Sequence, residues 1–304
     1  MRSPSRIATT LVLVALPLAA MAASTPPRTP GQRANSKTPL QSLVTTEKAF
    51  AKLSADQGMR TAFLTNLADD GVVFRPLAVN GKQSWTPRPD SKATLAWDPA
   101  YAEVSGSADL GFTTGPWEYT PAPDAASKQK LYGTFLSVWR RDQGNWKLVA
   151  DLGVSHDKQA EALGAVVFQP GPTHAATDSA AAPVDPLALD RLLSNSLASL
   201  GAQYAFPNWV AKDLRYLTDG AAPRTGSDAA AALAATAARS RWLPSGGGVA
   251  KAGDLGYTYG VRQDSAVVAG GAPDTTVYLH VWRRMPKDSW RIAAAVENPL
   301  RTKP

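Results

Sequence analysis

An internal repeat is the feature that most constrains this chain of 304 residues. The stretch ADLGFTTG at 108–115 returns as GDLGYTYG at 253–260, and LSVWRRDQGNW at 136–146 returns as LHVWRRMPKDSW at 279–290. The spacing between copies stays within 143 to 145 residues, which is far longer than a solenoid unit and close to the size of an ordinary domain. The repeat therefore predicts two tandem copies of a whole domain.

The N-terminus has the pattern of an export signal. Two arginines, Arg2 and Arg6, precede an apolar run from Ile7 to Ala19, and Ala20-Met21-Ala22 offers small residues for cleavage. We expect residues 1–23 to be a signal peptide and the mature protein to be secreted or periplasmic. No later apolar run reaches about 20 residues, so no membrane span is expected after cleavage. The chain has no cysteine, so its stability must come from core burial without disulfides.

Composition sets the remaining boundaries. Residues 24–38 are basic and rich in proline, which predicts a disordered segment. Residues 166–185 contain PGPTHAATDSAAAPV and are expected to be a linker. The two domains are then predicted at 39–165 and 186–304.

The net charge of +7 does not indicate a nucleic-acid partner. Residues 1–38 hold five basic and no acidic side chains, whereas residues 39–165 hold 13 basic against 14 acidic. In the second domain the arginines are scattered, which is typical of a solvated surface. The three histidines, His156, His174 and His280, lack metal-ligand spacing, so we expect no metal and no cofactor.

Each domain is expected to place its helices before its strands. An amphipathic helix begins near Leu40 and carries Glu47 on its apolar stripe; the second copy repeats this stripe around Asp190. The pattern next predicts a helix from Met59 to Leu67 and strands at 72–75, 102–104, 109–117, 131–141 and 146–151. The fold class is thus α+β, with an antiparallel sheet and the turn DQGN at 142–145 as a four-residue hairpin loop.

The glycines of the repeated stretch predict a bent strand. Gly111 and Gly115 point to one face of their strand, as do Gly256 and Gly260. Bare glycine at such positions permits a bulge or a sharp coil and leaves room above it. A sheet curved in this way around a helix makes a half-open cone.

A family resemblance follows from these residues together. Its motifs are TEKAF at 46–50, AF...L.DD at 62–70, W.P at 97–99, ADLGFTTG, and VWRRDQGNWKLVADLG at 138–153. In this arrangement most of 40–156 resembles the SnoaL-like branch of the nuclear transport factor 2 superfamily, in particular its exported domains of unknown function. Residues 186–300 resemble it more weakly.

The resemblance implies two tandem cone-shaped domains, each a strongly curved antiparallel sheet wrapped by N-terminal helices, with a pocket at the open end. It also implies pairing through the sheet, here as an intramolecular pseudo-dimer of the two domains or as a homodimer. The superfamily includes isomerases, dehydratases, cyclases, epoxide hydrolases and members without catalysis. The aspartate and tyrosine signatures of the steroid isomerases have no counterpart here, so their reaction is not transferred.

Glu47 and Asp151 are the candidate catalytic pair. A carboxyl group inside an apolar cone has a raised pKa, and a second carboxyl nearby raises it further, which suits proton transfer near neutral pH. The alternative is that both carboxylates only accept hydrogen bonds. Because Ala295 stands at the second-copy position of Asp151, any chemistry is expected in the first domain.

The tryptophan-bearing strand has two distinct faces. Leu136 and Val138 form an aliphatic face, whereas Phe135, Ser137 and Trp139 form an aromatic and polar one. One face should line the cone and the other should meet a partner sheet, and the sequence does not say which. The candidate ligand-binding residues are Trp97, Trp117, Tyr132, Trp139, Asp109, Asp190, His280 and Trp282. For Asp109, which recurs as Asp254, a structural role at the strand entry is the alternative.

Two functions remain open at this stage. One is a pocket for a small hydrophobic or aromatic molecule, with carboxylate acid/base chemistry or without it. The other is a non-catalytic interaction module whose cones are filled by their own side chains. The sequence assigns neither a substrate nor a reaction.

Overall fold

The computed structural model describes residues 37–157, 163–175, 184–237, 240–264 and 274–300. The expected signal peptide and most of the segment 24–38 lie outside the described residues. Lys37–Pro304 forms one compact unit. Below, residues 37–175 are called the first half and residues 184–300 the second half.

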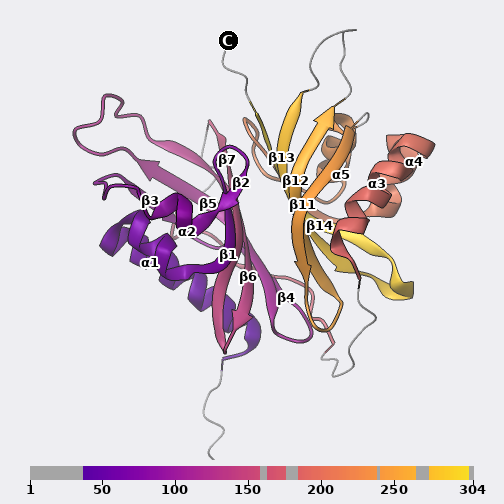
Figure 1. Cartoon of the computed structure of the whole chain (residues 1–304), viewed down its shortest axis with the longest axis horizontal. Coiled ribbons are helices and arrows are strands. Elements are labelled where there is room, and N and C mark those ends of the chain that lie inside the picture. The colour runs from indigo at the N-terminus through magenta and orange to yellow at the C-terminus, as the bar shows by residue number, and fades with distance from the viewer. Residues whose placement is uncertain (1–36, 158–162, 176–183, 238–239, 265–273, 301–304) are drawn as a thin grey trace, which may run out of the picture. The chain divides into compact units, whose positions relative to one another are not determined.

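The first half opens with helix α1 (Pro39–Asn66) (Figure 1). Thr38 caps it: the Thr38 hydroxyl accepts from the Gln41 amide N–H, and the Gln41 side chain accepts from the Thr38 amide. Gly58, with φ of 84°, kinks the helix, so the two predicted helices are the two arms of one bent element. The buried stripe of α1 includes Leu43, Glu47 and Phe50, as the amphipathic pattern predicts.

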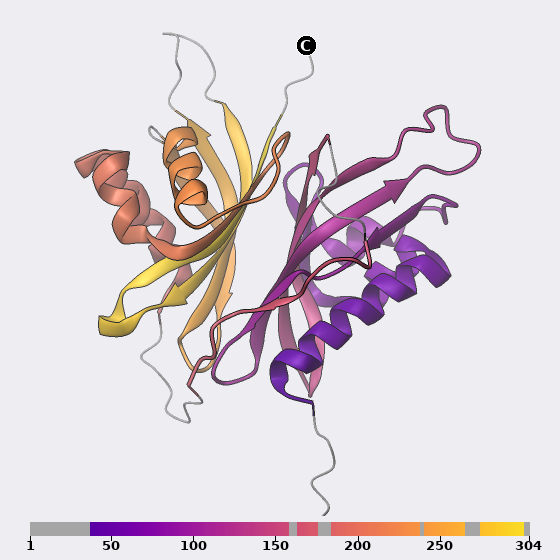
Figure 2. The same cartoon turned by 180° about the vertical axis from the view of Figure 1, so that it is seen from behind.

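A mixed sheet follows, with strand order β2-β1-β7-β6-β5-β4-β8 and β3 paired to β5. Its strands are β1 (Leu67–Phe74), β2 (Ala78–Asn80), β3 (Thr94–Trp97), β4 (Tyr101–Val104), β5 (Leu110–Thr120), β6 (Leu131–Asp142), β7 (Asn145–His156) and β8 (Gln169–Pro170), with the short helix α2 (Gly81–Trp85) after β2. Pairing is antiparallel except between β1 and β7 and between β4 and β8. Both cartoon views show α1 lying across one face of this sheet (Figures 1 and 2).

The second half follows the same order, except that it has two separate helices in place of α1, one strand in place of β3 and β4, and no counterpart of β8 among the described residues. Its elements are α3 (Pro186–Leu200), α4 (Ala202–Trp209), β9 (Val210–Thr218), β10 (Arg224–Thr225), α5 (Gly226–Thr236), β11 (Ser240–Val249), β12 (Leu255–Asp264), β13 (Thr275–Arg284), the 3-10 turn η1 (Pro286–Asp288) and β14 (Trp290–Pro299). The sheet runs β10-β9-β14-β13-β12-β11, and β9 pairs with β14 in parallel as β1 does with β7. The fold is therefore α+β with two sheets of corresponding topology.

The predicted length of the hairpin loop between β6 and β7 was wrong. The loop has two residues and not four, because Asp142 already pairs with Asn145. Gln143 and Gly144 both have positive φ, the conformation that a tight two-residue hairpin requires.

The glycines of β5 leave no open space. A side-chain carbon on Gly115 would meet the Asp98 carbonyl, and one on Gly260 would meet the Leu243 carbonyl, because neighbouring backbone lies against both positions. The irregularity is in the partner strand: β3 and β4 are separated opposite Gly115, and β11 has a register shift between Pro244 and Gly246 opposite Gly260. Glycine is needed here for close backbone approach.

The structure decides what each face of the tryptophan-bearing strand meets. Leu136 and Val138 of β6 belong to the same buried cluster as Leu279 and Val281 of β13, so the aliphatic faces of both sheets share one core. Phe135 and Trp139 instead pack with α1, and Tyr278 and Trp282 pack with α3, α4 and α5 in two separate clusters. The aromatic faces thus point to the helices.

Reciprocal hydrogen bonds join the halves at the turns before β5 and β12. The Gly106 amide donates to Asp254 Oδ2 at 2.7 Å, and the Lys251 amide donates to Asp109 Oδ2 at 3.2 Å. Gly106 and Lys251 are equivalent positions of the repeat, as are Asp109 and Asp254. Such an exchange of equivalent contacts is the signature of a two-fold interface.

A buried charge network lies beside these turns. Glu103 of β4 accepts from Arg283 Nε at its Oε1 (2.7 Å) and from Arg283 Nη2 at its Oε2 (2.6 Å), and His174 Nε2 lies 2.7 Å from the same Oε1. His174 Nδ1 also lies 2.9 Å from Asp254. Although burial lowers it, the hydrogen bonds that the protonated His174 ring donates to Asp254 and Glu103 raise the pKa of His174 to about 9. The predicted linker is therefore fixed to both halves at His174.

The shared aliphatic core predicts strong and comparable effects of truncation in either sheet. Leu136→Ala and Leu279→Ala each remove a side chain with no exposed surface, so each should lower the free energy of unfolding by about 2–5 kcal/mol. Leu192→Ala on α3, where the leucine is 51% exposed, is the matched control and should stay within about 0.5 kcal/mol. Urea unfolding monitored by tryptophan fluorescence measures all three, and equal small effects would contradict a shared core.

Candidate functional site

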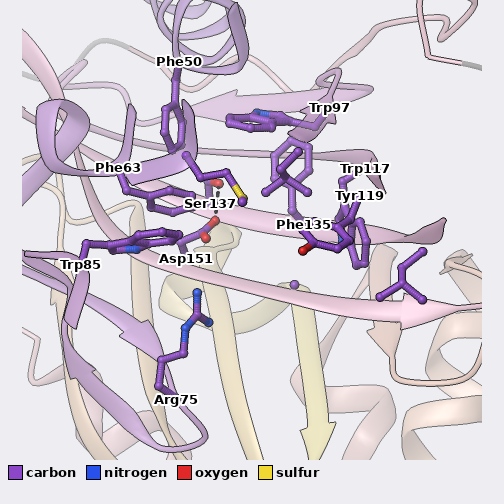
Figure 3. Close-up of a pocket in the computed structure, with 14 residues that line it drawn as sticks. Phe50, Phe63, Arg75, Trp85, Trp97, Trp117, Tyr119, Phe135, Ser137 and Asp151 are labelled. Atoms are coloured by element: carbon purple, nitrogen blue, oxygen red, sulfur yellow. Dashed lines mark hydrogen bonds between the residues drawn. The ribbon is translucent and has the colours of Figure 1, made fainter. Parts of the chain in front are cut away.

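A cavity of about 340 Å³ lies between α1 and the aromatic face of the first sheet. Its lining is mostly apolar and aromatic, with one acid and one base: Phe50, Met59, Phe63, Arg75, Trp85, Leu95, Trp97, Trp117, Tyr119, Leu131, Phe135, Ser137, Asp151 and Gly153. Figure 3 shows the rings around the space, with Asp151 at its floor and the Arg75 guanidinium pointing toward Asp151. This size and lining suit a small apolar molecule.

Strand pairing places Asp151 in the cavity. Asp151 of β7 is opposite Ser137 of β6, and the Ser137 hydroxyl donates to Asp151 Oδ1 at 2.8 Å. Burial raises the pKa of Asp151 to about 6, although the Ser137 hydrogen bond and the charge of Arg75 oppose the shift. The side chain is partly exposed, so a bound molecule can reach it. Asp151 therefore meets the requirements of an acid or base near neutral pH.

Glu47 lies behind the cavity wall and is not among the lining residues. It has no exposed surface. Trp97 Nε1 donates to its Oε1 at 2.7 Å, while Trp139 Nε1 and Thr113 Oγ1 donate to its Oε2 at 2.8 and 2.5 Å. Burial raises the pKa of Glu47 to about 7 against these three hydrogen bonds, and the nearby charge of Asp151 adds to the increase. Glu47 thus fixes Trp97, which lines the cavity, and Trp139, which does not.

The other predicted ligand contacts in the first half are divided. Trp97 and Trp117 line the cavity. Trp139 is fully buried beneath it against Glu47, and Tyr132 of β6 is not in the lining. Asp109 lies in the turn before β5, where it accepts hydrogen bonds from the second half.

Several lining residues were missed by sequence reasoning. Arg75 follows β1, at the end of the strand predicted at 72–75, and Trp85 ends α2 in a stretch for which the sequence predicted no element. Phe50 and Phe63 lie on the buried face of α1, and this apolar stripe was the signal that could have found them.

The corresponding interior of the second half is filled with rings. His280 takes the place of Ser137, and it pairs with Ala295 where Ser137 pairs with Asp151. Its ring centroid lies 4.5 Å from that of Tyr278 and 5.9 Å from those of Trp242 and Trp282. The predicted ligand-binding residues His280, Trp282 and Asp190 all have no exposed surface.

Asp190 takes over the role of Glu47 with a shorter side chain. It accepts from the Tyr278 hydroxyl at 2.9 Å and lies 2.9 Å from His280 Nδ1. It does not reach Trp242, the equivalent of Trp97, whose Nε1 has no hydrogen-bond partner among the described residues. Trp282 Nε1 donates to Thr258 at 2.8 Å. Asp190 therefore stabilises the packed core of the second half.

Two further findings concern metal binding and membrane spans. Within the described ranges, no group of three or more histidine and acidic side chains is arranged to hold a metal ion. None of the helices in these ranges is long and apolar enough to cross a membrane.

No protein-family model and no curated protein matches the chain. Solved structures resemble parts of it. A nuclear transport factor 2-like protein of unknown function from Shewanella oneidensis is 14% identical over 37% of this chain and 95% of its own, with a TM-score of 0.31. A ketosteroid isomerase-like protein from Erwinia carotovora is 14% identical over 39% of this chain and 98% of its own, with a TM-score of 0.28.

A nuclear transport factor 2-like superfamily protein from Salmonella enterica is 17% identical over 41% of this chain and 94% of its own, with a TM-score of 0.30. Each match spans less than half of this chain.

The raised pKa of Glu47 predicts a pH-dependent effect of Glu47→Gln. A carboxyl whose pKa is higher in the folded state favours folding below its unfolded pKa of 4.5, and this contribution is lost as the pH rises to about 7. The full change corresponds to about 3 kcal/mol. Glutamine cannot accept from three donors, so the variant should be less stable at pH 5, with a smaller difference at pH 8.

Urea unfolding of wild type and variant at both pH values measures this difference. Asp151 titrates in both proteins, so its contribution largely cancels in the comparison. A difference in the free energy of unfolding that does not change with pH would contradict the raised pKa of Glu47.

Proposed function

We propose that the first half binds a small hydrophobic or aromatic molecule in the cavity between α1 and the sheet, and that Asp151 exchanges a proton with it. The observation that carries this proposal is the placement of one partly exposed carboxyl, with its pKa raised to about 6, on the floor of an otherwise aromatic cavity. Glu47 supports the site by holding Trp97 and Trp139. The neighbour descriptions are compatible with this role and do not carry it.

We propose that the second half is a diverged copy with a structural role. Its interior is packed with His280, Tyr278 and Trp282, and Ala295 stands where the first half has Asp151. Its sheet covers the aliphatic face of the first sheet, and the reciprocal contacts of Asp109 and Asp254 support an intramolecular pseudo-dimer. A filled interior favours the interaction-module alternative for this half only.

We also propose that the protein works after export, in the periplasm or outside the cell. The pattern of residues 1–23 supports this. The ligand would then be a molecule of that compartment.

The comparison of the halves supplies a test of binding. Ser137→His introduces into the first half the side chain that fills the second, so it should block the cavity. We expect small molecules that remain with the wild-type full chain, purified from a bacterial envelope and identified by mass spectrometry, to be lost from this variant. His280→Ser is the matched control and should retain them, provided that the circular dichroism spectra of all three proteins agree. Equal retention by both variants would argue against the cavity as the binding site.

Proton transfer is tested with Asp151→Asn. If Asp151 exchanges a proton with the ligand, the retained molecule should incorporate deuterium from D₂O in the wild type and at least about 100-fold more slowly in the variant, because general acid/base groups contribute about 10²–10⁴ in rate. The variant should still retain the molecule. Equal incorporation by both proteins would leave a binding function without catalysis.

A further inference from the structure

Two guanidinium groups lie around Trp85, which lines one edge of the cavity. Arg75 lines the cavity, and its guanidinium lies 5.7 Å from the ring centre of Trp85. The guanidinium of Arg88 lies 4.8 Å from the same ring. Two cations therefore lie close to one indole of the cavity wall, although Arg88 itself is not among the lining residues.

The described residues form no close ion pair with either cation, although the charge of Asp151 acts on Arg75 from a greater distance. Arg75 Nη1 donates to the Phe74 carbonyl at 2.7 Å, and Arg88 Nε donates to the Ser84 carbonyl at 3.2 Å. Neither forms an ion pair with a described carboxylate, although Figure 3 shows the Arg75 guanidinium directed toward Asp151. The two charges repel each other: after burial, the charge of Arg88 is the next cause that lowers the pKa of Arg75. An anion between them would relieve this repulsion.

Trp85 adds a third donor. It is only 6% exposed, and its indole Nε1 has no hydrogen-bond partner among the described residues. A buried N–H without an acceptor is costly, and native structures rarely retain one without a ligand or water to satisfy it. Two guanidinium groups and an indole N–H can only donate hydrogen bonds to a ligand. They therefore favour a ligand group that only accepts hydrogen bonds.

We infer that the molecule bound in this cavity is an aromatic or apolar carboxylate, whose ring occupies the aromatic interior and whose carboxylate lies against Arg75, Arg88 and Trp85. This inference rests on the proposed function and adds the class of ligand. The planar fork of arginine matches a carboxylate in two-point geometry, and a charge-assisted hydrogen bond is about twice as strong as a neutral one.

The test uses two probes that share a ring system and differ in charge: 2-naphthoate and 2-naphthalenemethanol. Isothermal titration calorimetry with the full chain should show that 2-naphthoate binds at least about tenfold more tightly than the alcohol, as expected for charged hydrogen bonds. Arg75→Met keeps the aliphatic stem and removes the charge. It should weaken 2-naphthoate about tenfold and change binding of the alcohol less than about twofold.

Arg241→Met, at an exposed arginine of β11, is the matched control and should leave both affinities unchanged. Retained binding of the alcohol by Arg75→Met shows that the variant is folded. Equal affinity of the wild type for both probes, or equal weakening of both by Arg75→Met, would overturn the carboxylate inference and leave the proposed apolar site standing. Failure of both probes to bind the wild type would overturn the proposed site and this inference with it.

Discussion

The contact between the aliphatic faces of the two sheets is the constraint on which the rest of the structure depends. Side chains alternate along a strand, so once Leu136 and Val138 face the second sheet, Phe135, Ser137 and Trp139 must face the helices. The same argument holds for β13. A single choice of face therefore determines which residues can line a cavity in either half.

Whether the interior of each half is open or packed then depends on three differences between equivalent positions. Where the first half has Ser137 and Asp151, the second has His280 and Ala295, and Asp190 replaces Glu47. The imidazole fills the space that the serine leaves open, and the shorter acid binds the tyrosine and the histidine in place of two indoles. One scaffold thus supports a cavity with an acid at its floor and a fully packed core.

The cavity assigns different tasks to its charged groups. Glu47 accepts hydrogen bonds from three donors and has no exposed surface, so its role is to position Trp97 and Trp139. Asp151 accepts one hydrogen bond and keeps an oxygen available on the cavity side. Arg75 and Arg88 lie near the edge and form no ion pair with a carboxylate of the described residues, which makes them the groups that an anionic ligand would satisfy. Position relative to the cavity, more than residue type, separates these roles.

The sequence by itself determined the repeat, the α+β class and the strands around the tryptophans, because hydrophobic periodicity and turn residues are local properties. Only the tertiary structure decided which strand face meets which partner, that Glu47 lies behind the wall, and that Gly115 is covered by the backbone of Asp98. It also brought Arg75 and Trp85 to Asp151, which is about 70 residues away in sequence. Such contacts depend on strand pairing across the whole sheet, and no local pattern in the sequence contains that information.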